Sequence, residues 1–175
     1  MKISFDGHSD DEVIATYGSL LKELKQRGII RTHSIVGEFG ERIAINHYNS
    51  TPRLTKLSKV PPGTKGFDAV GRNGKRYSIK ATVIQVTGTF FGLPAPTSQE
   101  VIEPKFDFVI IVKFDRDYAV QTIAEITWDH FVEFRKWLPR MNAYNLPLTK
   151  KLLAKAKILF TGTQSAEDAG SGQVA

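Results

Sequence analysis

The sequence predicts an α/β protein of the α+β kind, in which helices flank a mixed central β-sheet. Two helical segments open the chain, strand-like segments follow, and two short helical segments come last, so the order does not alternate as βαβ units do. The 175 residues, 41% of them hydrophobic and 24% charged, suit one domain with its own core. We expect that domain over residues 1–160, followed by a disordered tail, rich in small and polar residues, over residues 161–175.

The first two elements are predicted to be helices. Ser9 and Glu12 have the spacing of a capping box, hydrophobic residues then recur at helical spacing, and Gly28 ends the segment. A second helix is expected over residues 34–47. It has an apolar side and, on a different stripe, two acids, Glu38 and Glu41.

The hydrophobic period then changes to that of strands. Residues 54–60 are expected to form a short strand, and residues 67–70 and 76–80 flank a turn sequence, which predicts a β-hairpin whose second strand continues to Val86. Residues 87–104 are rich in Gly, Pro, Thr and Ser and predict a long loop. Such a loop inside a compact domain is usually functional or mobile.

The rest of the domain is predicted to be two strands and two helices. The most apolar stretch, residues 106–114, predicts a central strand, and residues 118–126 predict its neighbour. Thr127 can cap a helix that ends before Pro139, and Thr149 can cap a last one. The first of these helices would carry Phe131, Phe134 and Trp137.

Composition narrows the classes of protein. The chain has no cysteine, which excludes disulfides and zinc–thiolate sites and is compatible with a reducing cytoplasm. No apolar run is long enough to span a bilayer, and the first residues lack the pattern of a signal peptide. We therefore expect a cytoplasmic protein that has no membrane partner.

Positive charge is concentrated in one segment. Residues 53–80 contain eight basic residues and one acid, Asp68, a net charge of +7, whereas the whole chain carries +6. A concentrated positive field favours a polyanion such as nucleic acid. The basic residues of the segment that we expect to contact DNA are Arg53, Lys56, Lys59, Lys65, Arg72, Lys75 and Arg76.

The register of the predicted hairpin decides whether it can carry a site, and two turns are chemically allowed. A two-residue turn would place Asp68 opposite Ile79. A three-residue loop, which requires glycine at its third position, where Gly74 stands, would instead place Asp68 opposite Ser78. Lys80 would then be the diagonal neighbour of Asp68 on the same face.

A carboxylate, a neighbouring polar group and a lysine on one sheet face suit metal-dependent hydrolysis of a phosphodiester. Mg²⁺ binds oxygen ligands and keeps several waters, and lysine can position a water or offset negative charge on phosphate. Spacing alone favours the simpler interpretation, an edge hairpin with solvated charges. An ordered motif that extends beyond the hairpin is needed to choose between the two.

Residues 66–68 (Gly-Phe-Asp) and 74–80 (Gly-Lys-Arg-Tyr-Ser-Ile-Lys) resemble the signature of the PD-(D/E)xK nuclease superfamily, which has the restriction-endonuclease-like fold. In that signature an acid on one strand precedes an acidic or amide residue, any residue, and lysine on the next strand. Residues 37–41 resemble the helix that supplies a further acid in many members. Residues 106–115 are similar to a later core strand and turn, so the resemblance runs from about Ile30 to Phe134.

The resemblance implies a role for each matching residue. Asp68 would be the principal metal ligand, Lys80 the catalytic lysine, and Glu41 the helix acid and second metal ligand, with Glu38 as second choice. Ser78 stands where the family has an acidic or amide residue. The cofactor would be Mg²⁺, with Mn²⁺ as a substitute.

The expected function is that of a metal-dependent DNA endonuclease of the type II restriction kind, a homodimer that cuts both strands of double-stranded DNA. The alternative is a nucleic-acid-binding module of the same fold that does not cut, since Ser78 removes one expected ligand. A third interpretation is a purely structural or partner-binding domain in which the basic hairpin is fortuitous. In the long loop, Phe90 and Phe91 would either stack against bases or anchor the loop in the core.

Overall fold

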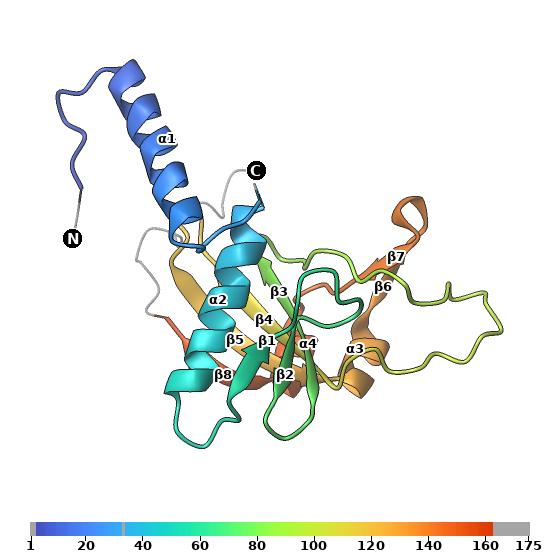
Figure 1. Ribbon diagram of the computed structural model, residues 1–175. Helices are drawn as coiled ribbons and strands as arrows, with labels where there is room; N and C mark the ends of the chain where they lie inside the picture. The colour runs from blue at the N-terminus through green and yellow to red at the C-terminus, as the bar shows by residue number, and fades with distance from the viewer. Residues whose placement is uncertain (1–2, 33, 163–175) are drawn as a thin grey trace.

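The computed structural model describes residues 3–32 and 34–162, and it confirms the predicted mixed α+β architecture. A six-stranded sheet has the order β1-β2-β3-β4-β5-β8 (Figure 1). Only the β3–β4 pair is parallel among the pairs of this sheet. The strands are β1 (Leu57–Lys59), β2 (Ala69–Gly71), β3 (Arg76–Thr82), β4 (Phe108–Phe114), β5 (Val120–Thr127) and β8 (Lys157–Thr161).

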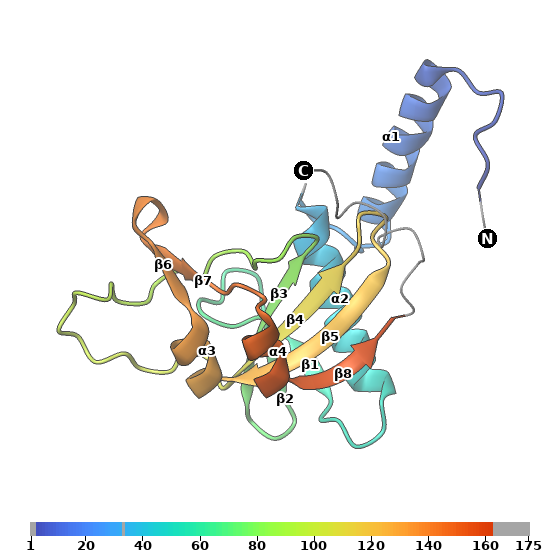
Figure 2. The same cartoon turned by 180° about the vertical axis from the view of Figure 1, so that it is seen from behind.

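Helix α1 (Asp10–Gln26) projects away from the sheet (Figures 1 and 2). The predicted capping box forms, since the Ser9 side chain accepts from the Glu12 N–H and the Glu12 carboxylate accepts from the Ser9 N–H. At the other end Gly28 adopts a φ of +62°, and the N–H of Ile29 donates to the carbonyl of Leu24 (2.8 Å). This is the Schellman arrangement, which ends a helix at a left-handed glycine.

Helix α2 (Ile35–Ser50) covers one face of the sheet. It comes unusually close to β3, because a Cβ atom at Gly40 would lie only 2.1 Å from the Cβ of Ala81. Between α2 and the sheet lies a hydrophobic core that includes Ala44, Tyr48, Tyr77 and the even-numbered positions of β4, Ile110 and Val112. Alternate residues of the central strands thus face α2, as the two-residue period of a strand requires.

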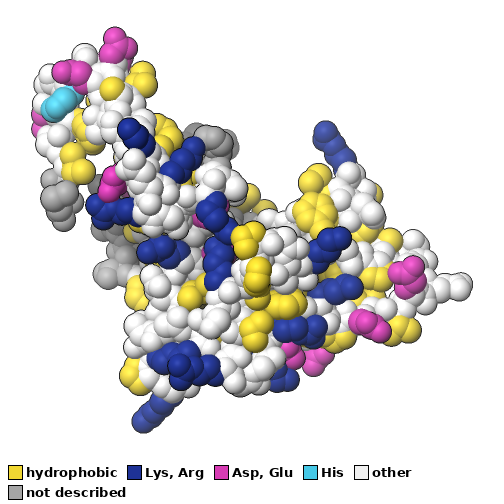
Figure 3. All heavy atoms as spheres, viewed as in Figure 1, with side chains coloured by type: hydrophobic (Ala, Val, Ile, Leu, Met, Phe, Trp, Pro, Cys, Tyr) yellow, Lys and Arg dark blue, Asp and Glu magenta, His cyan; other side chains and the backbone are white. Residues whose placement is uncertain are grey.

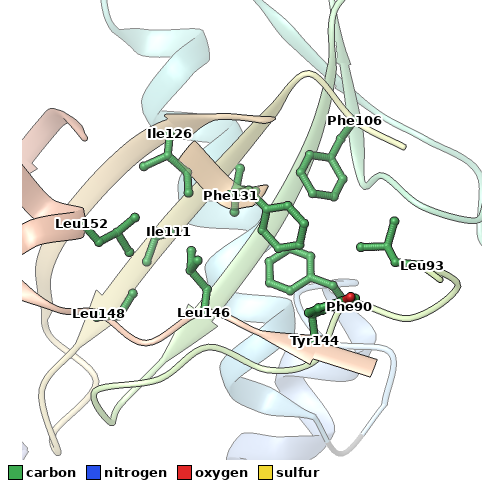
Figure 4. Packing of buried hydrophobic residues seen from close by; sticks show 11 residues of the cluster. Phe90, Leu93, Phe106, Ile111, Ile126, Phe131, Tyr144, Leu146, Leu148 and Leu152 are labelled. Carbon is green, nitrogen blue, oxygen red and sulfur yellow. The ribbon is translucent and has the colours of Figure 1, made fainter. Parts of the chain in front are cut away.

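A second core fills the opposite face of the sheet. It contains odd-numbered positions of β4 and the aromatic residues Phe90, Phe106 and Phe131, whose rings lie 4.6–5.8 Å apart (Figure 4). The elements that cover it are α3 (Trp128–Phe134), α4 (Lys150–Lys155) and a separate hairpin of β6 (Lys136–Leu138) and β7 (Ala143–Asn145), joined by the 3₁₀ turn η1 (Pro139–Met141). Both faces of the central strands are therefore packed.

Several predicted boundaries are wrong, and tertiary contacts explain them. The helix capped by Thr127 ends at Phe134, so Trp137 lies in β6, where its ring packs 4.8 Å from that of Tyr144. The sequence prediction also missed β8, an edge strand that depends on pairing with β5. β3 ends at Thr82 rather than continuing to Val86, because the Thr82 hydroxyl bonds to the carbonyls of Ile84 and Val86 and turns the chain.

Two expectations concern the ends and the surroundings of the domain. Thr161 is the last residue of β8, and the Gly162 N–H donates to the Gln121 carbonyl (2.8 Å). The rest of the predicted tail, residues 163–175, lies outside the described residues. Within residues 3–32 and 34–162, none of the helices combines the length and apolar character needed to cross a membrane.

Candidate functional site

The β2–β3 hairpin has the three-residue loop. Ala69 pairs with Tyr77 and Val70 with Arg76, a register that places Asp68 opposite Ser78. The Gly71 N–H donates to the Lys75 carbonyl (2.9 Å), and Gly74 adopts a φ of +75°. The left-handed conformation is the one that this loop requires at its third position. Of the two registers that the sequence allows, the structure therefore has the one that can carry a site.

Asp68 is held by the strand opposite it. Its Oδ2 atom accepts hydrogen bonds from the Ile79 N–H (2.7 Å) and from the Ser78 hydroxyl (3.3 Å). Ser78 is buried, so this hydroxyl serves as a positioning donor to Asp68. Among the described residues both hydrogen bonds end on Oδ2, which leaves Oδ1 for a ligand.

Asp68, Ser78 and Lys80 line one cavity of about 160 Å³. The loop that follows β3 lines the cavity with Phe90 and Phe91, and the Lys80 Nζ lies 4.9 Å from the centre of the Phe90 ring. A cation over an aromatic face is attracted by the ring quadrupole. The loop thus supports the lysine that the hairpin presents.

Glu41 lies at a second hollow, which Asp68 also borders. Both acids line this hollow, together with Arg31, Lys59 and residues 60–64. Glu41 comes from α2, on the face of the sheet opposite Lys80, and Asp68 borders both spaces. Asp68 therefore lines one hollow with Ser78 and Lys80 and an adjoining hollow with Glu41.

In this arrangement Glu41 is neutralised by two cations. Its Oε2 atom lies 2.5 Å from the Lys59 Nζ and 3.7 Å from an Arg31 guanidinium nitrogen. These ion pairs are partly exposed to solvent, where such pairs contribute little and exchange readily. A cation bound at Asp68 would compete with Lys59 for the same carboxylate.

Glu38, the second choice for the helix acid, has a structural position. Its buried carboxylate accepts hydrogen bonds from the backbone N–H groups of Arg31 and Thr32 (3.0 Å each) and from the Thr32 hydroxyl (3.2 Å). Burial alone would raise the pKa of Glu38, but the Arg31 and Thr32 donors outweigh it and hold this pKa below its ordinary value. Glu38 therefore fastens the segment before α2 to the helix.

The described residues contain no group of three or more His, Asp or Glu side chains that could hold a metal ion. Two carboxylates, Asp68 and Glu41, border the same hollow. Mg²⁺ is commonly bound by one or two carboxylates, with waters and substrate phosphates completing its octahedron. The donor set around Asp68 thus fits a single hard cation that keeps much of its water.

The predicted DNA-binding residues have different surroundings. Lys59 is paired with Glu41, and the Lys56 Nζ donates to the Asn49 carbonyl (2.6 Å). Arg53, Lys65, Arg72 and Lys75 are exposed. Figure 3 views the α2 side of the molecule, where Lys and Arg side chains predominate over acids on the body.

Two of these bases form an ion-pair cluster at the hairpin. Asp107 accepts from the Lys75 Nζ (3.2 Å) and the Arg76 backbone N–H (2.8 Å), and the Arg76 Nε lies 3.4 Å away. Burial would raise the pKa of Asp107, but these donors and the positive charge of Lys75 lower it overall. Lys75 and Arg76 thus tie the hairpin to the start of β4.

The sequence prediction missed two residues of the site, Lys105 and Arg31. Lys105 lines the cavity of Asp68 and Lys80, and Arg31 lines the hollow of Glu41, although neither belongs to a recognisable motif. Phe91 lines the same cavity as Lys80 and is 61% exposed, whereas its neighbour Phe90 is 4% exposed. Phe90 therefore anchors the loop in the core, whereas Phe91 has an exposed ring that is free to stack.

No protein-family model matches the chain, and no curated protein matches it in sequence.

Proposed function

We propose that the protein is a Mg²⁺-dependent endonuclease of the PD-(D/E)xK type that hydrolyses phosphodiester bonds of double-stranded DNA. The observation that carries this proposal is the fixed carboxylate of Asp68 at the border of a cavity that also contains Lys80. We further propose that it acts in the cytoplasm as a homodimer of the type II restriction kind. A two-fold dimer presents two equivalent sites to the two strands of a symmetric sequence.

DNA binding is assigned to the basic surface around the hairpin. Arg53, Lys65 and Arg72 are exposed there, and Lys105 extends the positive charge to the cavity. Phosphate contacts from such residues give affinity without sequence preference and weaken as salt is added. The exposed ring of Phe91 at the cavity offers a surface on which a base can stack.

Asp68 and Glu41 would hold the metal ion. When bound, Mg²⁺ polarises a phosphoryl oxygen and lowers the pKa of a coordinated water. Ser78 and the Ile79 N–H keep the Asp68 carboxylate oriented, and Phe90 supports Lys80 from below. Lys80 can then orient the attacking water or offset negative charge that develops on the phosphate.

The second candidate is a DNA-binding module of the same fold that does not cut. It is favoured by the small number of acids, since Ser78 donates to Asp68 where the family signature has an acidic or amide residue. The ion pair between Glu41 and Lys59 also favours this candidate, because Lys59 balances the charge of the carboxylate without a metal. The two candidates share the basic surface and differ only in cleavage.

The test is nicking of supercoiled plasmid by the purified protein with Mg²⁺ or Mn²⁺, alongside a DNA-binding measurement. Asp68→Asn and Lys80→Ala should each lower the cleavage rate at least about a hundredfold, while Asp68→Asn leaves DNA affinity nearly unchanged. Lys150→Ala, which removes an exposed lysine from α4, is the matched control and should cut like the wild type. Binding without cleavage would replace the nuclease by the binding module, and cleavage that survives Asp68→Asn would show that Asp68 is not the metal ligand.

A further inference from the structure

Helix α1 presents a hydrophobic stripe in which Val13, Tyr17 and Leu20 are exposed and Leu24 is partly covered. None of its 17 residues is buried, and the large hydrophobic residues Tyr17 and Leu20 are 55% and 54% exposed. Figure 3 shows hydrophobic side chains on this projecting helix. A helix of this length gains most of its stability from packing an amphipathic face, so α1 is built for a contact that the single chain does not supply.

The spacing of the stripe suggests what covers it. Val13, Tyr17, Leu20 and Leu24 follow one another at intervals of four, three and four residues, the alternation of a coiled-coil seam. The intervals are symmetric about a centre between residues 18 and 19. A two-fold axis through that centre would bring Val13 opposite Leu24 of a second copy, and Tyr17 opposite Leu20 of that copy.

Charge selects the direction of such a pair. The first turn of α1 is acidic, with Asp10, Asp11 and Glu12, and its end is basic, with Lys25 and the capping residue Arg27. Continued by three residues at each end, the seam reaches Asp10 and Arg27. An antiparallel pair places these opposite charges together, whereas a parallel pair would place Asp10 against its own copy.

The existing contacts of the end residues do not oppose this arrangement. Arg27 Nε forms an ion pair with Glu23 (2.5 Å) within the helix, and both side chains are exposed. Such a pair contributes little to stability, and the guanidinium retains further donors for a second carboxylate. Ile14, next to the seam, is the most exposed hydrophobic side chain of the helix and widens the apolar face on one side.

We propose that α1 is a dimerisation helix that packs antiparallel against α1 of a second copy of this chain. The inference specifies the interface of the homodimer proposed above, but it rests on the spacing, exposure and charge of α1 and not on nuclease activity. The competing surface is the edge strand β8, where Ile158 and Phe160 are also exposed. The two surfaces are separated by substitutions that touch only α1.

The first measurement is the oligomeric state of the full chain by sedimentation over a range of concentrations. The wild type should be a dimer, and Leu20→Glu should raise the dimer dissociation constant about a hundredfold, because it places a carboxylate in the seam. Ala15→Glu adds the same charge to an exposed position on the far side of α1 and is the matched control. Circular dichroism of both variants checks that the helix and the body remain folded.

The second measurement is disulfide formation, which the absence of cysteine from the chain makes unambiguous. Val13→Cys and Leu24→Cys proteins, one carrying an extra tag, are mixed and oxidised. The antiparallel pair predicts a mixed disulfide and no disulfide between two copies of Val13→Cys, since those positions would lie roughly 16 Å apart along the axis.

Three outcomes would overturn the proposal. A wild type that is monomeric at every accessible concentration would show that α1 serves another partner. A dimer that tolerates Leu20→Glu would place the interface elsewhere, with β8 as the next candidate. A disulfide between two copies of Val13→Cys would show a parallel pair.

Discussion

The two faces of strand β3 have opposite characters. On one face Tyr77, Ile79 and Ala81 pack beneath α2, which approaches closely through Gly40. On the other face Ser78 and Lys80 open onto the cavity that they share with Asp68. Because side chains alternate along a strand, five consecutive residues form a closed core on one side and a polar site on the other.

The difference shows how the packed face positions the polar one. α2 can supply Glu41 next to Asp68 only because Gly40 has no side chain to separate the helix from Ala81. The Ile79 N–H that holds Asp68 belongs to the same residue whose side chain is buried under α2. Packing under α2 therefore helps to fix the position of Asp68 at the cavity.

The largest effect should come from the core beneath the cavity. Phe90→Ala should lower the free energy of unfolding by about 3–5 kcal/mol, because it removes a buried ring from the aromatic cluster. Phe91→Ala is the matched neighbour and should change it by less than about 0.5 kcal/mol, because its ring is exposed. Urea unfolding measures both, and equal losses would contradict the division of the pair into an anchor and an exposed ring.

The close approach of α2 should give the next largest effect. Gly40→Ala should lower the free energy of unfolding by about 2–3 kcal/mol. The methyl group of the new alanine would overlap Ala81 and push the helix from the strand. Gly18→Ala is the control, since a Cβ there meets nothing within 4 Å and alanine favours the helix. A thermal melt distinguishes them, and an unchanged melting temperature for Gly40→Ala would mean that α2 does not depend on this contact.

Glu38→Gln tests the structural acid of α2 and should show pH dependence. The folded-state pKa of Glu38 lies below its ordinary value of 4.5, so its contribution is present above that value and is lost as pH falls through the folded pKa. The variant should be about 1–2 kcal/mol less stable than the wild type at neutral pH, and the difference should shrink near pH 3. Unfolding at both pH values measures this, and a constant difference would assign the effect to shape rather than charge.

The smallest effect should appear at Ser78, on the cavity face. Ser78→Glu places a second carboxylate beside Asp68, which should destabilise the protein without metal and strengthen Mg²⁺ binding. Adding Mg²⁺ should then raise the melting temperature by about 2–4 °C. Ser78→Leu has a similar size but offers no ligand atom, and it should respond no more than the wild type. If both variants respond alike, or neither does, Asp68 is not part of a metal site.

Residues near one another in the chain were predictable from the sequence because local chemistry decides them. The capping box at Ser9, the glycine that ends α1 and the apolar central strand β4 all appear as expected. Gly74 limited the hairpin to two registers, since glycine suits the third position of a three-residue loop. The register of the three-residue loop places Asp68 opposite Ser78, and both residues line the cavity with Lys80.

Tertiary packing decided the remaining features. Trp137 follows a helical pattern, but contact with Tyr144 places it in β6, and β8 exists as a strand only because β5 provides its partner. Glu38 and Glu41 lie three residues apart with similar local sequence. Backbone donors from Arg31 and Thr32 make the first structural and leave the second beside Asp68.

The sequence by itself determined which residue types the site contains and, through glycine conformation and strand alternation, which of them share a face. It could not determine which side chains from distant segments complete that face, because Lys105, Arg31 and Phe91 reach the hollows only when the chain is folded. Local preferences act over a few residues, whereas these contacts join segments tens of residues apart. Their formation depends on the burial of both cores of the sheet, which no single segment encodes.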